Sequence, residues 1–295
     1  MANVDVYQMV TNKVMEQLEQ GVCPWQRPWT GVGTEDGGSI NYVTRKPYSL
    51  LNQILLGKAG EWLTFKQIKD CGGSLKKGAK GGMVVYYGKF LTHKEVKADD
   101  ETTTKVEERE IPILKYYYVF HIDDTTGIES KIEKKDEESV DTVQPIEEAE
   151  NIINDYVTRE GIKFQNDQPS NRAFYAPLAD SVTVPMISQY ADVEEYYSTT
   201  FHEFTHSTGN KKRLNRIDGH IVKFGDKNYS REELVAEMGA AMLCNVIGIS
   251  TDKAFKNSVS YIKSWLRALA NDKKMVVWAS SRAEKAAKYT LNDNG

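Results

Sequence analysis

Two histidines and a glutamate in the stretch YYSTTFHEFTHSTG are the residues of this chain best suited to chemistry. His202, Glu203 and His206 form the pattern HExxH. On a helix, positions i and i+4 share one face, so both imidazoles can reach one ion. Imidazole is a good ligand for zinc, and a catalytic zinc site uses three protein ligands and keeps one position open. The expected cofactor is Zn²⁺, with another divalent ion such as Mn²⁺ as the alternative.

Glu203 is the predicted catalytic residue of this motif. It lies about a quarter turn from the histidines, where its carboxylate can accept a proton from an activated water and return it to a leaving amine. HExxH also arises by chance, so its context matters. Here the motif lies on a capped helix with an apolar flank, after a short β region and before a helix that carries carboxylates. The pattern therefore predicts a metallopeptidase site.

The third ligand is expected from the downstream segment SREELVAE. Glu233 and Glu237 lie one turn apart on the same helix face, and Ala236 and Ala240 would let that helix approach the HExxH helix closely. We expect Glu233 to bind the metal and Glu237 to orient a histidine by accepting its N–H. The spacing from Ser230 to Glu233 also fits a capping box. If Glu233 caps the helix, Glu237 becomes the better candidate ligand.

The remaining polar residues near the motif have weaker assignments. Tyr229 or Tyr197 could donate a hydrogen bond to a developing oxyanion, although tyrosines at helix starts more often pack. His220 lies in a polar stretch and is expected to be a solvated surface residue. His93 and His121 have no histidine or cysteine partner nearby, so no metal is expected there.

The first 90 residues combine positive charge with aromatic side chains. They carry 11 Lys or Arg against 7 Asp or Glu. Single-stranded nucleic acid binds to such a mixture, because cations follow the phosphates and aromatic faces stack on bases. The candidate DNA contacts are Trp25, Trp29, Arg45, Tyr48, Trp62, Lys76, Lys77 and Lys80. The charge is modest and tryptophans are more often core residues than stacking platforms, so a packed core is the alternative.

The length of 295 residues favours two domains, both α+β. We expect an N-terminal domain at 1–128, an acidic linker at 129–148 and a C-terminal domain at 149–295 with a small sheet followed by helices. Helices are predicted at 4–20, from 47, and at 64–70, 146–161, 192–209, 230–246, 253–270 and 274–290. Strands are predicted at 83–91, 111–122, 161–165, 172–176 and 181–185. The first two strands are expected to pair, with the acidic stretch 94–110 as the loop between them.

Several features predict a location in the cytoplasm without membrane association. The longest charge-free apolar run, Met238 to Thr251, is too short to cross a bilayer. The N-terminal segment lacks the basic and apolar regions of a signal peptide. The three cysteines form no CxxC pair and no disulfide framework, which is typical of a reducing compartment.

Motifs along nearly the whole chain resemble the ArdC-type antirestriction proteins. PWQRPW, NYVTRKPYSLLNQILL, EWLTFKQ and GGSLKKGAKG resemble the N-terminal domain of that family. NRAFYAP, DSVTVP, YYSTTFHEFTHSTG, KRLNR and YSREELVAEMGAAMLC resemble its C-terminal zincin-like metallopeptidase domain. The acidic stretches 94–110 and 129–148 depart from the family pattern by being longer and more charged.

The resemblance implies a protein of a plasmid or integrated conjugative element that binds single-stranded DNA and shields incoming DNA from host restriction. It carries the family's metal site onto His202, Glu203, His206 and Glu233. It also implies an unidentified protein or peptide substrate. Two alternatives stay open: a DNA-binding protein with a structural or vestigial metal site, and a metallopeptidase effector that cleaves a host protein.

Overall fold

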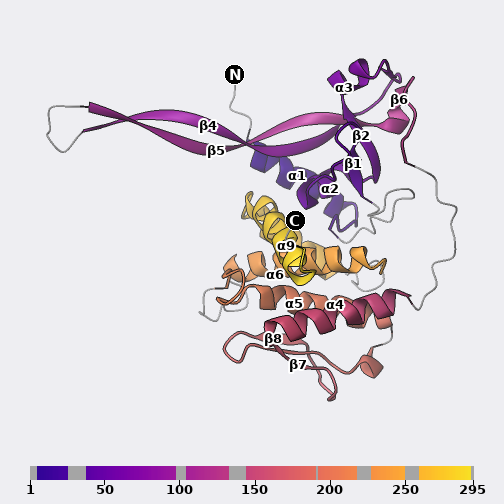
Figure 1. Cartoon of the computed structure of the whole chain (residues 1–295), viewed down its shortest axis with the longest axis vertical. Helices are drawn as coiled ribbons and strands as arrows, with labels where there is room; N and C mark the ends of the chain where they lie inside the picture. Colours follow the sequence, from indigo (N-terminus) through magenta and orange to yellow (C-terminus); the bar gives the residue numbers. More distant parts are fainter. Residues whose placement is uncertain are drawn as a thin grey trace.

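The computed structural model of the chain has an α+β architecture with a long two-stranded ribbon at one end (Figure 1). It describes residues 5–25, 38–97, 104–132, 144–190, 192–217, 227–249 and 259–293. The helices are α1 (Val6–Glu19), α2 (Leu50–Leu56), α3 (Phe65–Asp70), α4 (Gln144–Glu160), α5 (Val193–Thr208), α6 (Lys227–Val246), α8 (Val259–Ala270) and α9 (Met275–Thr290). The strands are β1 (Ser39–Asn41), β2 (Gly60–Thr64), β3 (Ser74–Leu75), β4 (Gly82–Lys97), β5 (Thr104–His121), β6 (Thr125–Thr126), β7 (Lys163–Gln165), β8 (Phe174–Ala176) and β9 (Ser181–Thr183).

The ribbon of β4 and β5 is the main departure from the expected elements. The two strands pair antiparallel from Gly82 opposite Val119 to Lys97 opposite Thr104. The predicted pairing is confirmed, but much of the acidic stretch 94–110 continues the strands and does not form a loop. The paired strands project from the body of the molecule as a ribbon, and the pairing satisfies the backbone N–H and C=O groups between the two strands (Figure 1).

The rest of the N-terminal half supports the base of this ribbon. The sheet order is β1-β2-β5-β4, with β1 and β2 parallel and the other pairs antiparallel. A separate antiparallel pair joins β3, which follows α3, to β6, which follows β5. Leu63, Ile68 and Ile122 form a small buried cluster behind the sheet.

In the C-terminal half, helices stack in layers on a small sheet. Strands β7, β9 and β8 form that sheet, each within a predicted strand segment. Helix α5 contacts β8 and β9, and α6 contacts α5 on one side and α9 on the other. Asp192 caps α5 as predicted, since its Oδ1 accepts from the N–H of Glu194 at 3.0 Å.

The start of α6 corrects one expectation. The helix already includes Lys227, so Ser230 lies inside its first turn and is not the N-cap. The capping-box alternative for Glu233 is therefore wrong. Similarly, α4 begins at Gln144, so the end of the expected linker 129–148 is helical. The first part of the helix predicted at 253–270 lies outside the described residues.

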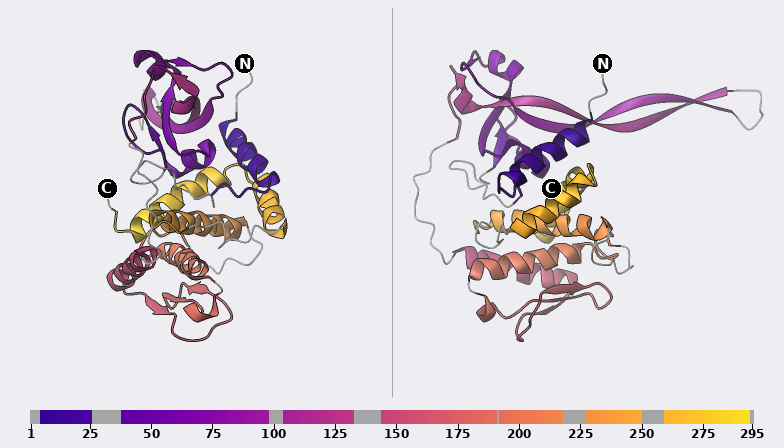
Figure 2. Two further views of the ribbon diagram at one scale, coloured as in Figure 1. Left: turned by 90° about the vertical axis from the view of Figure 1, so that its right-hand side faces the viewer. Right: turned by 180° about the vertical axis from the view of Figure 1, so that it is seen from behind.

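The largest hydrophobic core joins the two halves of the chain. Val10, Val14 and Leu18 of α1 are fully buried. They belong to one cluster with Leu234 of α6 and Leu269 of α8. Helix α1 contacts α8 and α9, and α2 contacts α9; both views in Figure 2 show α1 beside these C-terminal helices. The boundaries proposed for the two domains thus stay a prediction, and the core crosses them.

Within the described part of the chain, no helix combines the length and apolar character needed to span a bilayer.

Candidate metal centre

Close packing of α5 against α6 brings the chemical residues together. Ala236 and Ala240 are fully buried, as expected for small residues between helices. The two helices lie very close at Gly239, where a Cβ atom would lie 2.5 Å from Cγ2 of Thr205. Thr205 lies inside the HExxH motif, so the absence of a side chain at Gly239 sets the distance between the two helices.

The side chains of His202, His206 and Glu233 converge across this contact. The two Nε2 atoms of the histidines are 3.1 Å apart. Glu233 places Oε2 at 3.6 Å from Nε2 of His202 and Oε1 at 3.5 Å from Nε2 of His206. Tetrahedral zinc with bonds near 2.1 Å needs ligand atoms about 3.4 Å apart. The three predicted ligands therefore fit a single divalent ion.

Among the described residues, these three side chains could together hold a metal ion. One ligand atom from each lies within 4.8 Å of the others. All three side chains are partly exposed, so water and a substrate can reach the position between them. Three protein ligands would leave a fourth position of a tetrahedral ion free for water or a substrate.

Negative charge surrounds the histidines. Burial by itself would lower the pKa of His202, but the bond to Glu233 and the charges of Glu237 and Glu203 raise that pKa to about 9. Burial would raise the pKa of Glu233, but the bond to His202 and the charge of His206 hold it below its usual value. The site therefore favours bound positive charge, as a cation site must.

Glu203 lies beside the ligands and is largely hidden from water. It is 8% exposed and follows His202 directly on α5. Its negative charge contributes to raising the pKa of both His202 and Tyr229.

Only one of the two tyrosines considered as hydrogen-bond donors reaches the site. The Tyr229 hydroxyl is hydrogen-bonded to Glu233, and burial together with the charge of Glu233 raises the pKa of this tyrosine to about 12. Tyr197 is instead buried and donates to Oε1 of Glu150 at 3.0 Å. It is a packing residue on the far side of α5.

A carboxylate that the sequence analysis missed lies against His206. Oε1 of Glu232 is 3.4 Å from Nδ1 of His206, the ring nitrogen away from the metal position. The Arg216 guanidinium holds Glu232 with contacts of 2.9 to 3.2 Å and also donates to the Thr205 carbonyl at 2.7 Å. Glu237 was expected in this orienting role; it is buried and its charge acts on His202, so its function stays a prediction.

The segment after α5 is fixed by two buried arginines of the motif KRLNR. Arg213 binds Asp180 through Nη2 at 2.6 Å and approaches Glu160 at 3.3 Å. Arg216 binds Glu232 as described above. The sequence held a signal for Glu232 in Arg216, 16 residues before it, but the partner of this arginine could not be chosen among many glutamates.

The expected DNA contacts of the N-terminal half are divided between core and surface. Trp25 is 1% exposed and packs edge-on against Trp265, with ring centroids 5.6 Å apart. Trp62 is 5% exposed, packs edge-on against His121, and donates from Nε1 to the Lys58 carbonyl at 3.1 Å. Both are core residues, so their expected role as stacking platforms is corrected. Burying the large apolar surface of these indole rings in the core stabilises the fold more than leaving it in contact with water.

The other expected contacts lie at or near the surface, apart from Trp29, which with His220 lies outside the described residues. Arg45 is ion-paired with the buried Glu61. Tyr48 packs partly against the cluster around Val84. Lys76, Lys77 and Lys80 are exposed, and Lys76 donates to the Asp123 carbonyl at 2.6 Å. Other exposed aromatic residues of this half are Phe65, Tyr86, Tyr87, Tyr117 and Tyr118.

Two family models cover most of the chain. Residues 4–120 match the N-terminal domain of the anti-restriction factor ArdC. Residues 147–282 match a zincin-like metallopeptidase. Both matches confirm the resemblance drawn from the sequence motifs.

Solved structures and curated relatives agree with these matches. Crystal structures of the antirestriction protein ArdC from plasmid R388, one metal-free and one Mn(II)-bound, have a TM-score of 0.72, with 31% and 30% identity over 98% of both chains. Protein y4eC of Sinorhizobium fredii is 27% identical over 97% of this chain and 91% of its own length. A DNA primase TraC of Escherichia coli is 30% identical over 97% of this chain, which spans only 27% of the primase. The chain belongs to the family of ArdC antirestriction proteins, with an ArdC-type N-terminal domain joined to a zincin-like metallopeptidase domain.

Proposed function

We propose that this protein is an antirestriction factor of a mobile element that binds single-stranded DNA and hydrolyses peptide bonds at a metal centre. The observation that carries the proposal is the convergence of His202, His206 and Glu233 beside the buried Glu203. The protein would act in the cytoplasm, where incoming DNA meets host restriction enzymes.

His202, His206 and Glu233 would hold the divalent ion, which when bound supplies Lewis acidity toward a water and a peptide carbonyl. The expected ion is Zn²⁺. The Mn(II)-bound crystal structure of the R388 relative supports Mn²⁺ as the alternative. Glu232 would fix the ring of His206 by accepting the N–H at Nδ1.

Two residues of the chain would then act on the substrate. Glu203 accepts a proton from the attacking water and returns it to the leaving amine. The Tyr229 hydroxyl donates to Glu233 in the structure, and turning this single O–H from Glu233 toward the substrate would let it stabilise the carbonyl oxygen as negative charge develops there. The substrate of this reaction is a protein or peptide that is not yet identified.

DNA binding is supported by the N-terminal half. The match to the ArdC N-terminal domain covers residues 4–120, and this part of the chain exposes lysines and aromatic side chains on its surface. The plasmid origin of the R388 relative supports a role in the transfer of mobile DNA.

Glu203→Gln tests the peptidase. The amide cannot take up a proton, so peptide cleavage should fall by about 10²- to 10⁴-fold while metal affinity stays unchanged. Cleavage is measured on a casein or peptide-library substrate, and metal affinity by calorimetry. The control is Glu195→Gln, the same change in the first turn of the same helix. Cleavage that survives Glu203→Gln would exclude this mechanism.

A structural role for the metal is favoured by a separate observation. Helix α6 carries Glu233 and also contributes Leu234 and Met238 to the core shared with the N-terminal helices. A bound ion would thereby stabilise the DNA-binding half. Full protection of DNA from restriction by the Glu203→Gln variant would favour this function over proteolysis.

DNA binding is tested separately by a gel shift with single-stranded oligonucleotides. The affinity should fall steeply as salt rises, because counterions are released from the phosphates. An absence of any shift at low salt would instead favour a metallopeptidase effector that acts on a host protein.

A further inference from the structure

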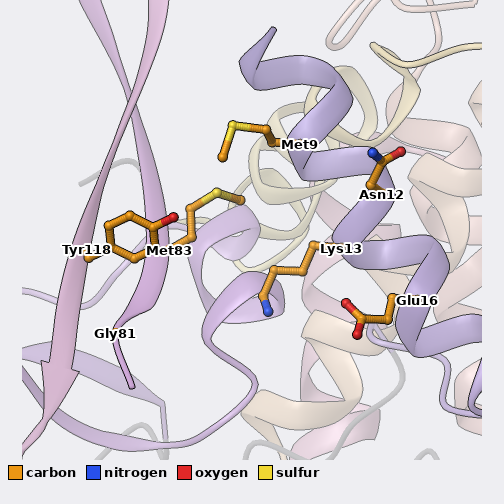
Figure 3. A pocket seen from close by; sticks show the side chains of 7 residues that line it. All are labelled: Met9, Asn12, Lys13, Glu16, Gly81, Met83 and Tyr118. Carbon is orange, nitrogen blue, oxygen red and sulfur yellow. The ribbon is translucent and has the colours of Figure 1, made fainter. Parts of the chain in front are cut away.

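A pocket of about 350 Å³ lies between α1 and the base of the ribbon, in the N-terminal half and with no residue of the metal centre (Figure 3). Its lining residues are Met9, Asn12, Lys13, Glu16, Gly81, Met83 and Tyr118. This volume lies at the small end of the range of about 300 to 1,000 Å³ found for ligand pockets. It suits one small planar group better than a length of peptide.

Tyr118 forms the flat wall of the pocket. It is 50% exposed, although Val119 beside it is fully buried. Its ring is held edge-on by Tyr116, with centroids 5.9 Å apart, and Tyr116 packs against the shared core. A rigid aromatic ring with half its surface open is a stacking platform.

The backbone at Gly81 and the thioethers of Met9 and Met83 form the rest of the apolar lining of the pocket. A Cβ atom at Gly81 would lie 3.0 Å from Cβ of Tyr118, so the missing side chain lets the chain run closely beside this residue. Met83 is the register partner of Tyr118, and Figure 3 shows Met83 and Met9 between the tyrosine and α1. Thioethers make favourable contacts with aromatic rings.

The polar residues of the pocket match the other parts of a nucleotide. Lys13 lines the pocket, and the exposed Lys80 directly precedes Gly81, so cations are available for phosphate. Asn12 accepts a bond from Gln8 at its Oδ1, which leaves its amide N–H groups as donors. Glu16 is an acceptor. Donors, an acceptor, a stacking face and cations together are what recognition of a base and its phosphate requires.

We propose that this pocket takes one nucleobase of bound single-stranded DNA, stacked on Tyr118, with the flanking phosphates beside Lys13 and Lys80. The inference rests on the proposed DNA-binding function and assigns it a place on the surface. Tyr117, the next residue, lies on the opposite face of β5 because side chains alternate along a strand. It therefore serves as a matched control, with the same side chain and 37% exposure.

Fluorescence anisotropy with a labelled oligo-dT tests the pocket. Tyr118→Ala should weaken binding about 5- to 150-fold, the loss that corresponds to one stacked base. Tyr118→Phe should retain most of the affinity, and Tyr117→Ala should leave it unchanged. Lys13→Ala, at a partly exposed position, should lower the slope of log affinity against log salt by about 1. Oligonucleotides with a single abasic site at successive positions provide a second test. At one position the missing base should lower the affinity of the wild-type protein, and it should leave the affinity of Tyr118→Ala unchanged.

The outcomes separate the two proposals. Wild-type protein that binds no single-stranded DNA at low salt overturns the proposed DNA-binding function and this inference with it. Wild-type protein that binds while Tyr118→Ala and Lys13→Ala bind equally well overturns the pocket alone. A loss of DNA affinity in Tyr117→Ala alone would indicate that DNA binds the other face of the ribbon, and it would also overturn the pocket proposal. Circular dichroism of each variant shows whether it is folded. If Tyr118→Ala is unfolded, Lys13→Ala still tests the pocket.

Discussion

The candidate metal centre was predicted from the spacing of residues along a helix, whereas the proposed DNA contacts of the N-terminal half were predicted from amino-acid composition. At the metal centre, the spacing of His202 and His206 fixes their geometry, because a helix places i and i+4 on one face. In the N-terminal half, composition selected Trp25 and Trp62, and both lie in the core. Spacing within one element thus predicts where side chains meet, while composition does not predict which side chains face water.

The ribbon illustrates the same difference within three consecutive residues. Tyr116 packs against the shared core, whereas Tyr117 and Tyr118 are exposed on opposite faces. A run of identical residues carries no alternation that could distinguish these faces. Which of these aromatic residues face solvent is therefore determined by what covers each face of the sheet, and only the fold reveals that.

The largest expected effect tests the metal ligands. Glu233→Gln should lower Zn²⁺ or Mn²⁺ affinity by more than about 100-fold. Loss of a residue that only hydrogen-bonds to a ligand lowers metal affinity by about 10- to 100-fold, and Glu233 is a proposed ligand itself. Glu237→Gln should have a clearly smaller effect, since its carboxylate lies outside the convergent group. Calorimetric titration of metal-free protein measures both. A larger loss in Glu237→Gln would reverse the assignment of the third ligand.

The next prediction concerns Trp25, which composition placed at the DNA. Trp25→Ala should lower the free energy of unfolding by about 3 to 5 kcal/mol, because the indole is buried against Trp265. Urea unfolding followed by circular dichroism measures this. Lys77→Ala, at an exposed neighbour of the same predicted surface, should leave stability unchanged. A Trp25→Ala protein of normal stability with impaired DNA binding would restore the stacking interpretation.

Much of the fold was predictable from local patterns, including α1, α5 and the pairing of β4 with β5. The three proposed ligands were selected from sequence and converge in space, and Glu203, which was selected with them, is buried on the same helix as the two histidines. The start of α6 was misplaced because Ser230 has the spacing of a cap, and the tertiary contacts that begin the helix earlier have no local signature. The contact of Gly239 with Thr205 was missed for the same reason, since it joins two helices.

A smaller effect is expected for Glu232, the carboxylate found only in the structure. Glu232→Gln should reduce metal affinity by about 10- to 100-fold, because it weakens the bond that orients His206. Glu160→Gln is the matched control: Glu160 is also paired with a buried arginine of the KRLNR motif, Arg213, but lies away from the histidines. Equal metal affinities in the two variants would show that the contact at 3.4 Å does not orient the ring.

The smallest expected effect concerns His121, which is buried in the N-terminal half and serves the fold. Its Nδ1 accepts from the N–H of Asp123 at 3.2 Å, so Nε2 carries the proton and donates to the Ala59 carbonyl at 3.0 Å. Burial and the charge of Lys58 lower its pKa, against the opposing effects of the Ala59 bond, Asp123 and Asp124. This contrasts with His202, whose pKa is raised.

A lowered pKa has a defined sign for stability. The unfolded chain binds a proton near pH 6.5 while the folded chain does not, so stability is complete above about pH 6.5 and falls as the pH drops toward the lowered pKa. The glutamine of His121→Gln does not titrate, so this variant should lack the pH-dependent part of the stability that comes from His121. Urea unfolding of both proteins in chelator, at about pH 7 and about pH 5, isolates it as the difference between the two pH dependences. If the free energies of unfolding of wild type and His121→Gln fall in parallel between the two pH values, the fold does not hold His121 neutral. The pKa of His121 would then not differ in direction from that of His202 in the way described here.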